Sequence, residues 1–172
     1  MLRIPYYIHG NWKLDAEKLK SLETRVVDDS NYQLPEKVYT TFHNGFEDEE
    51  LKSFYVELAD RIAKEQAYYV NSFYTCTYWI QVYNKDAIHP IHTHFTMGDN
   101  TIISWVHFLK IPDTPCFRFT DGKNYLVPEQ QEGDIIVYPS YIRHEVINHQ
   151  EDFNRIVVAG NINLVSHENE TA

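Results

Sequence analysis

The second half of the chain is a series of short β-type runs separated by turn residues, and this pattern constrains the fold most strongly. From about residue 71 onward, such runs include FYTCTYWIQVY, TIISWVHFL, DIIVYP and RIVVAGNINLV. Their separators, such as NKD, MGDN, TDGKN and EQQEGD, supply the Gly, Asn and Asp residues that chain reversals need. About eight strands in roughly a hundred residues predict a jelly roll or sandwich.

The first seventy residues carry a helical pattern behind one strand-like run, RIPYYIH. In DAEKLKSLETRV the leucines and the valine recur at steps of three and four, which predicts a short amphipathic helix. A second helix is predicted over about residues 48–67, where one stripe contains Leu51, Phe54, Leu58 and Ile62. The acidic start EDEE suits the positive end of its dipole. We therefore expect a mainly β protein with supporting N-terminal helices.

Length and composition favour one globular domain. We expect residues 1–172 to form a single unit, with the supporting strand and helices in 1–70 and the β core in 71–165. The 13 Tyr and 9 Phe favour half-buried pleated surfaces. A formal net charge of -10 repels polyphosphate, which argues against nucleic acid as a partner.

The cysteines and the lack of a long apolar run bear on location. Cys76 and Cys116 are too few for a disulfide framework and lack the paired spacing of a thiolate zinc site, so we expect two buried thiols. No window approaches the roughly 18 apolar residues of a membrane span. We therefore expect a soluble, cytoplasmic protein without a membrane partner.

The stretch HPIHTHF contains three closely spaced histidines. Side chains on a strand alternate between faces, so His92 and His94 are expected to point the same way, with Thr93 opposite. Two imidazoles from one rigid strand suit an open metal site. Regular alternation turns His89 to the other face, although Pro90 can change that register. Histidines on half-exposed strands commonly bind nothing, and we interpret four others in that way: His9, His43, His149 and His167.

A C-terminal stretch, EGDIIVYPSYIRHEVINHQEDFNRIVVAGNI, offers partners for this histidine pair. His144 begins one β-type run and Arg155 begins the next, and a hairpin between them would bring both side chains toward one pocket. An arginine that enters an apolar strand is costly to bury unless it has an anionic partner. These residues strengthen the case for a metal site beyond that of an isolated His-x-His pair.

Taken in order, HTH, GDIIVYPSYIRHEV and RIVVAGNI resemble the 2-oxoglutarate- and iron-dependent oxygenases, especially their small prolyl-hydroxylase-like members in bacteria and phages. The resemblance covers roughly residues 74–164 and implies a double-stranded β-helix, a cupin-like jelly roll that holds Fe(II) at its mouth. It implies that His92 and the distal His144 bind iron. It also implies that Arg155 pairs with the far carboxylate of 2-oxoglutarate, which the planar guanidinium suits. Tyr83 matches a tyrosine that hydrogen-bonds this co-substrate, and Asn161 matches an asparagine without an implied role.

Position 94 departs from the family pattern, because most relatives carry a carboxylate there. The iron-binding set becomes His92, His94 and His144, unless Asp99 in the MGDN turn or His89 replaces His94. Three neutral imidazoles leave Fe(II) its full charge, which an anionic 2-oxoglutarate would partly neutralise.

The resemblance implies a dioxygenase in which Fe(II), 2-oxoglutarate and O2 hydroxylate an unreactive C–H bond, with no catalytic residue beyond the metal ligands. The sequence does not identify the substrate, and a prolyl or other protein side chain is the nearest expectation. One alternative is a cupin-like three-histidine dioxygenase without 2-oxoglutarate, which explains position 94 but not Arg155. Another is a non-catalytic jelly-roll interaction module. For a phage-encoded protein, the expected location is the host cytoplasm.

Several other features are expected to be structural. Trp105 and His107 alternate with apolar neighbours, which predicts a core or a pocket wall. The dipeptide Gly133-Asp134 predicts the turn before DIIVYP. A group of tyrosines fits either a substrate groove or an ordinary strand-rich core, and it contains Tyr68, Tyr69, Tyr74 and Tyr78.

Overall fold

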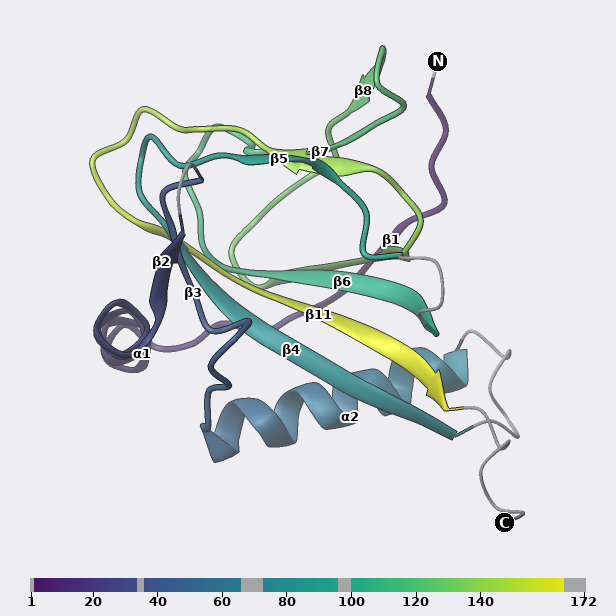
Figure 1. The fold of residues 1–172 in the computed structure, drawn as a ribbon, viewed down its shortest axis with the longest axis horizontal. Helices are drawn as coiled ribbons and strands as arrows, with labels where there is room; N and C mark the ends of the chain where they lie inside the picture. Colours follow the sequence, from purple (N-terminus) through teal and green to yellow (C-terminus); the bar gives the residue numbers. More distant parts are fainter. Residues whose placement is uncertain (1, 34–35, 66–72, 96–99, 166–172) are drawn as a thin grey trace.

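The computed structural model describes residues 2–33, 36–65, 73–95 and 100–165, which form two facing β-sheets with two helices outside the larger one (Figure 1). In spatial order, the larger sheet contains β1 (Tyr7–Asn11), β9 (Asp134–Pro139), β6 (Thr101–Lys110), β11 (Arg155–Val165), β4 (Phe73–Tyr83), β3 (Val38–Thr40) and β2 (Asn31–Gln33). The smaller sheet contains β5 (His89–His92), β10 (His144–Val146), β7 (Phe117–Thr120) and β8 (Tyr125–Leu126). The helices are α1 (Ala16–Asp29) and α2 (Glu49–Glu65).

All strand pairs within the described residues are antiparallel, and this arrangement confirms the expected jelly roll with N-terminal helices. Three predicted runs coincide with β4, β9 and β11. The helix that follows Asp15 is confirmed, because this side chain accepts the Lys18 N–H at 2.8 Å as an N-cap. The second predicted helix is also confirmed as α2; of its expected range, residues 66 and 67 lie outside the described part of the chain.

The sequence pattern did not predict β2 and β3. Each contains three residues, too few to display a period of two, and they add to the larger sheet beside β4. The first seventy residues therefore contribute strands to the main sheet as well as both helices. The assignment of residues 1–172 to one domain stays a prediction.

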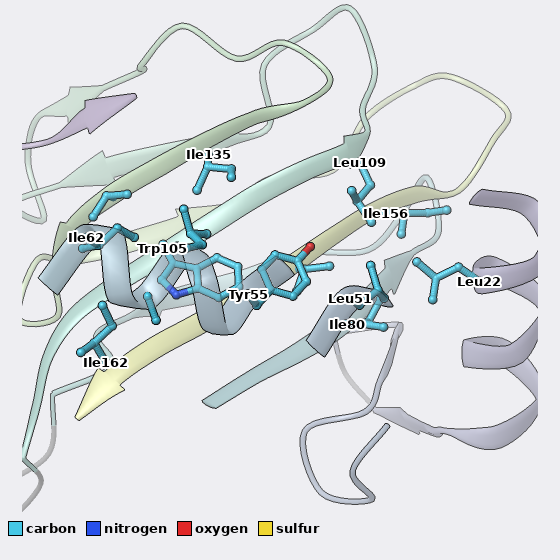
Figure 2. Close-up of a cluster of buried hydrophobic side chains, with 14 of the residues drawn as sticks. Leu22, Leu51, Tyr55, Ile62, Ile80, Trp105, Leu109, Ile135, Ile156 and Ile162 are labelled. Carbon is cyan, nitrogen blue, oxygen red and sulfur yellow. The ribbon is translucent and has the colours of Figure 1, made fainter. Parts of the chain in front are cut away.

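One face of the larger sheet packs on the helices. Figure 2 shows Tyr55 of α2 beside Trp105 of β6, with ring centroids 4.8 Å apart and nearly parallel planes. Gly160 lies opposite Trp105 in the β11–β6 pair, and a Cβ there would overlap the indole ring. Glycine at this position therefore lets the indole lie against the backbone of β11.

His107 also points to the helix-side core, with its Nε2 2.8 Å from the Trp12 carbonyl oxygen and its Nδ1 2.9 Å from the Tyr55 hydroxyl. Since the carbonyl can only accept, Nε2 donates, and Nδ1 accepts from the hydroxyl. The prediction that Trp105 and His107 are core residues is confirmed, because both are fully buried.

The tyrosine groove does not form where the structure can test it. The Tyr74 hydroxyl donates to Asp60 of α2 at 2.7 Å, and the Tyr78 ring lies 5.0 Å from that of Tyr55. Both tyrosines therefore pack against α2, as core residues of a strand-rich protein do. Tyr68, Tyr69 and His167 lie outside the described residues.

The remaining structural expectations have clear outcomes. The turn before β9 is confirmed: Gly133 adopts φ 94, and the Asp134 N–H donates to the Gln131 carbonyl at 3.0 Å. Both cysteines are free, with Cys116 buried and Cys76 half-buried. Within the described residues, neither α1, with 14 residues, nor α2, with 17, is long and apolar enough to cross a bilayer.

The other face of the larger sheet encloses a second core with the smaller sheet. Its buried side chains come from both sheets and include Tyr83, Phe108, Phe117, Phe119 and Val157. Alternation along β11 turns Arg155, Val157, Ala159 and Asn161 toward this inter-sheet space, while Ile156, Val158 and Ile162 belong to the helix-side core. The polar residues of β11 thus enter the space between the sheets.

Candidate metal centre and adjoining pockets

Three histidines converge between the sheets, and one possible ligand atom from each of His92, His94 and His144 lies within 4.8 Å of the others. His92 and His144 face each other across the β5–β10 pair, with ring centroids 4.2 Å apart. The His94 ring lies 5.0 Å from that of His144. Nitrogen ligands at about 2.1 Å from one ion are about 3–4 Å apart, so small side-chain rotations would let one cation contact all three.

Backbone carbonyls orient two of these rings. The Nδ1 atom of His92 lies 2.8 Å from the Pro90 oxygen, and that of His144 lies 3.0 Å from the Ile142 oxygen. A carbonyl can only accept, so each Nδ1 carries the hydrogen and each Nε2 keeps a lone pair. This hydrogen-bonding pattern is typical of metal-binding histidines.

Two hydrogen-bonded side chains of the larger sheet orient the third ring. The His94 Nδ1 lies 2.8 Å from the Asn161 Oδ1, and the buried Ser104 hydroxyl donates to the same oxygen at 2.8 Å. Asn161 and Ser104 face each other across β11 and β6. The amide oxygen accepts both hydrogens, so the His94 Nε2 also presents a lone pair. Sequence reasoning found Asn161 but no role for it, and it missed Ser104.

Burial keeps the three imidazoles uncharged. Desolvation, aided by His92, lowers the pKa of His94 to about 4. Desolvation lowers the pKa of His92 and places that of His144 well below its ordinary value. All three rings are therefore neutral near pH 7, which is the form that binds a cation.

The local geometry around the histidines differs from the strand prediction in two ways. β5 ends at His92, so His94 is placed by its N–H bond to the Ser140 carbonyl (3.0 Å) and by Asn161 rather than by strand alternation. The expectation that His89 faces away from His92 is wrong: their rings stack with centroids 4.1 Å apart. A register shift in the β5–β10 pair between residues 144 and 146 accounts for this, because a bulge reverses the alternation. Asp99 lies outside the described residues.

Arg155 lies in the inter-sheet space behind the histidines, with its residue 2% exposed. Its guanidinium carbon is 4.1 Å from the centroid of the Tyr83 ring, its cross-strand partner on β4. Among the described residues, its Nε and Nη2 have no hydrogen-bond partner. A buried cation with unpaired donors is costly, so this arrangement fits an anion that binds there.

Tyr83 also connects this arginine to the histidine side of the pocket. Its hydroxyl donates to the Gln81 Oε1 at 2.9 Å and lies 3.2 Å from the His89 Nδ1. Burial raises the pKa of Tyr83 to about 12, so the hydroxyl keeps its proton. Gln81 was not predicted as a site residue; it shares a face of β4 with Tyr83, two positions away, and that spacing was a usable signal.

The expected hairpin between the strands of His144 and Arg155 is wrong. β10 pairs with β5 and β7, whereas β11 pairs with β4 and β6. The two strands lie in opposite sheets, and their side chains both line the pocket between those sheets. Tyr138 of β9, another residue that sequence reasoning missed, lines the same pocket with its hydroxyl 3.3 Å from the His144 Nε2.

Two pockets meet at the histidines. The inner pocket is lined by Arg155, Tyr83 and His144, together with apolar residues such as Phe108 and Phe117. The outer pocket is lined by residues that include Phe42, His43, Trp79 and Asn161. The residues common to both are Gln81, His89, His92 and His94. A ligand at the histidines can therefore be reached from two separate chambers.

The other described histidines outside the candidate site lie in different environments. His9 is half-buried with its Nδ1 3.7 Å from a Glu65 carboxylate oxygen, as befits a surface residue. His43 is exposed but lines the outer pocket. His149 is buried at 2% exposure, which corrects the expectation of a half-exposed position.

Comparisons with known proteins support the fold. No protein-family model matches the chain, and no curated protein matches it. Among solved structures, a Pseudomonas putida prolyl-4-hydroxylase is similar at 17% identity and a TM-score of 0.71, over 95% of this chain and 94% of that one. The viral collagen prolyl hydroxylase of Paramecium Bursaria Chlorella virus-1, in a 2-oxoglutarate complex, is similar at 12% identity and a TM-score of 0.66, over 94% and 96%.

A third similar structure is HygX from Streptomyces hygroscopicus with nickel, 2-oxoglutarate and hygromycin B bound, at 11% identity and a TM-score of 0.63 over 93% of this chain and 83% of that one. At these identities the likeness concerns the fold. The chain has the fold of the 2-oxoglutarate- and iron-dependent oxygenases, and the expected resemblance to their prolyl-hydroxylase-like members is confirmed at that level.

Proposed function

We propose that this chain is a 2-oxoglutarate- and Fe(II)-dependent dioxygenase, in which His92, His94 and His144 hold the metal and Arg155 and Tyr83 hold the keto acid. The observation that carries the proposal is the inner pocket, where three uncharged imidazoles share one chamber with a buried guanidinium whose Nε and Nη2 have no hydrogen-bond partner in the described part of the chain. A keto diacid fits these two ends, since one carboxylate can pair with the arginine while the other end reaches the metal.

The residues of the chain bind and position the reactants. His92, His94 and His144 would hold the metal through their imidazoles, and three protein ligands would leave room for the keto acid to bind as well. The Arg155 guanidinium fixes the far carboxylate, and the apolar rings of Phe108 and Phe117 exclude water around the keto acid. Iron bound with the keto acid supplies the activation of dioxygen that hydroxylation needs.

Hydroxylation of a side chain is the reaction that we propose, with succinate and carbon dioxide as by-products. Structural neighbours include prolyl hydroxylases, one of them from Trichoplax adhaerens in complex with a hypoxia inducible factor peptide fragment. A prolyl or other protein side chain is therefore the nearest substrate. Two free thiols within the described residues agree with a location in the reducing cytoplasm, which we include in the proposal.

The test of this function is an anaerobic titration with Fe(II) followed by 2-oxoglutarate, with the weak visible charge-transfer band of the chelate as the readout. We expect both ligands to bind and the band to develop only when both are present. Iron binding without any effect of 2-oxoglutarate would favour the cupin-like three-histidine dioxygenase instead. If neither ligand binds, the chain is a non-catalytic jelly-roll module.

The hydrogen bond from His94 to Asn161 gives a further prediction. Asn161→Ala removes the acceptor that orients this ring, and the loss of such an outer hydrogen-bond partner typically weakens metal affinity by roughly 10- to 100-fold. We expect a loss of that size in calorimetric titrations with Zn2+, and recovery in Asn161→Asp, which restores an acceptor. Asn163→Ala is the matched control, because Asn163 lies two residues further along β11 and accepts from Thr101 at 2.6 Å. Equal affinity of Asn161→Ala and the wild type would refute the role.

A further inference from the structure

We propose that the outer pocket binds an uncharged, ring-bearing group of the substrate that carries a hydrogen-bond acceptor, with the ring stacked on Phe42. The inference rests on the proposed function, because it takes the histidines between the pockets as the metal site. His92 and His94 line both pockets, whereas Arg155 lines only the inner one. A group in the outer pocket would therefore approach the metal without displacing the keto acid.

The charge of the outer pocket sets the first property of its ligand. None of the described residues that line it is Asp, Glu, Lys or Arg, although the whole chain has a formal net charge of -10. A charged group that entered would lose hydration and gain no counter-charge from the described side chains of the pocket wall, which is costly. The pocket is therefore suited to a neutral group.

The exposed aromatic ring sets the second property. Phe42 is 57% exposed, yet its ring makes edge-type contacts with Trp79 at 5.0 Å and with His43 at 4.9 Å. The Trp79 ring lies 5.4 Å from that of His94, so the aromatic residues extend from the surface to the candidate metal centre. A ring held in this way offers exposed surface for stacking at little entropic cost.

Two carboxamides set the third property. The Gln81 Oε1 accepts from the Tyr83 hydroxyl, and the Asn161 Oδ1 accepts from both His94 and Ser104. With their oxygens engaged, the NH2 groups of both side chains have no acceptor among the described residues. Both side chains line the outer pocket, so they offer N–H donors to a ligand that carries an acceptor. A carbonyl oxygen on the ligand meets that need.

Three probes of equal size separate these properties: benzamide is neutral, benzoate is anionic and benzamidinium is cationic. Binding is measured by saturation-transfer NMR at pH 8, where ordinary histidines are neutral, with Zn2+ and 2-oxoglutarate present to occupy the inner pocket. We expect benzamide to bind at least about tenfold more tightly than either charged probe, a difference of about 1.4 kcal/mol. Equal or tighter binding of a charged probe, or no binding of benzamide, overturns the proposal.

Substitution locates the bound probe. Phe42→Ala should abolish benzamide binding, while Phe95→Ala should not, because Phe95 is a similarly exposed phenylalanine (47%) that does not line the outer pocket. Both side chains are exposed, so neither change should unfold the protein. Unchanged binding of benzamide by Phe42→Ala overturns the stacking role.

Two sets of titrations distinguish this proposal from the proposed function: benzamide with protein that contains no added metal or keto acid, and the metal and keto acid by themselves. If the protein prefers benzamide over the charged probes and this preference depends on Phe42, while Zn2+, Fe(II) and 2-oxoglutarate do not bind, the outer-pocket proposal stands and the oxygenase function fails. If the metal and the keto acid bind but benzamide does not, the oxygenase function stands and the outer-pocket proposal fails.

Discussion

His144→Ala is expected to abolish specific metal binding by this chain. The side chain is 3% exposed, its Nδ1 is fixed by the Ile142 carbonyl, and its ring lies 4.2 Å from that of His92. Removal of one of three ligands should weaken the affinity by more than the roughly 100-fold upper range for loss of an outer hydrogen-bond partner. Anaerobic calorimetric titration with Fe(II), repeated with Zn2+, measures the loss.

His149→Ala is the matched control, because His149 is another buried histidine, 2% exposed, outside the group of possible ligands. Its affinity for Fe(II) and Zn2+ should equal that of the wild type, and circular dichroism should show that both variants fold. If His144→Ala retained an affinity within about tenfold of the wild type, the three histidines would not form the metal centre.

Arg155→Met is expected to change ligand affinity and stability in opposite directions. Loss of one partner from a buried, hydrogen-bonded charge pair costs about 2–5 kcal/mol, so 2-oxoglutarate affinity should fall roughly 30- to 4,000-fold. In the free protein, the same change removes a buried cation whose Nε and Nη2 have no partner among the described residues. Relief of that penalty, about 1–3 kcal/mol, should outweigh the lost contact with the Tyr83 ring and raise Tm.

Binding titrations of 2-oxoglutarate with the wild-type and variant proteins measure the affinity, and thermal unfolding without ligands measures Tm. Each 1 kcal/mol corresponds to about 2–4 °C in a domain of this size. Arg118→Met is the control, because this half-buried arginine is paired with Glu145 at 2.6 Å and lies over Tyr125. It should lower Tm and leave the keto-acid affinity unchanged. A fall in Tm for Arg155→Met with full keto-acid affinity would contradict the role of this arginine.

The fold was predictable where the strands are long and apolar. β4, β9 and β11 carry runs of β-branched and aromatic residues bounded by turn residues, and the structure has them at the predicted residues. Three-residue strands such as β2 show no period of their own, because their pairing with neighbouring strands defines them. Sequence periodicity therefore predicted the jelly roll but not the full width of its larger sheet.

The residues that meet in the candidate site were visible in the sequence, but much of their geometry was not. His92 and His94 lie together, as expected, but His94 is placed by its contacts with Ser140 and Asn161 rather than by strand alternation. The bulge that turns His89 to the same side depends on the register of β10, a strand more than fifty residues away. The hydrogen bond between His94 and Asn161 joins residues 67 positions apart. Such contacts arise from tertiary packing, so no local pattern reports them.

The three histidines are anchored to different sheets. His92 and His144 belong to strands of the smaller sheet, whereas Asn161 and Ser104 tie His94 to β11 and β6 of the larger one. A cation bound by all three would therefore link the two sheets of the sandwich. Separation of the two sheets would then require rupture of a coordination bond, so metal binding should slow amide hydrogen exchange in both sheets. The residues that we propose for catalysis would then also stabilise the packing of the two sheets.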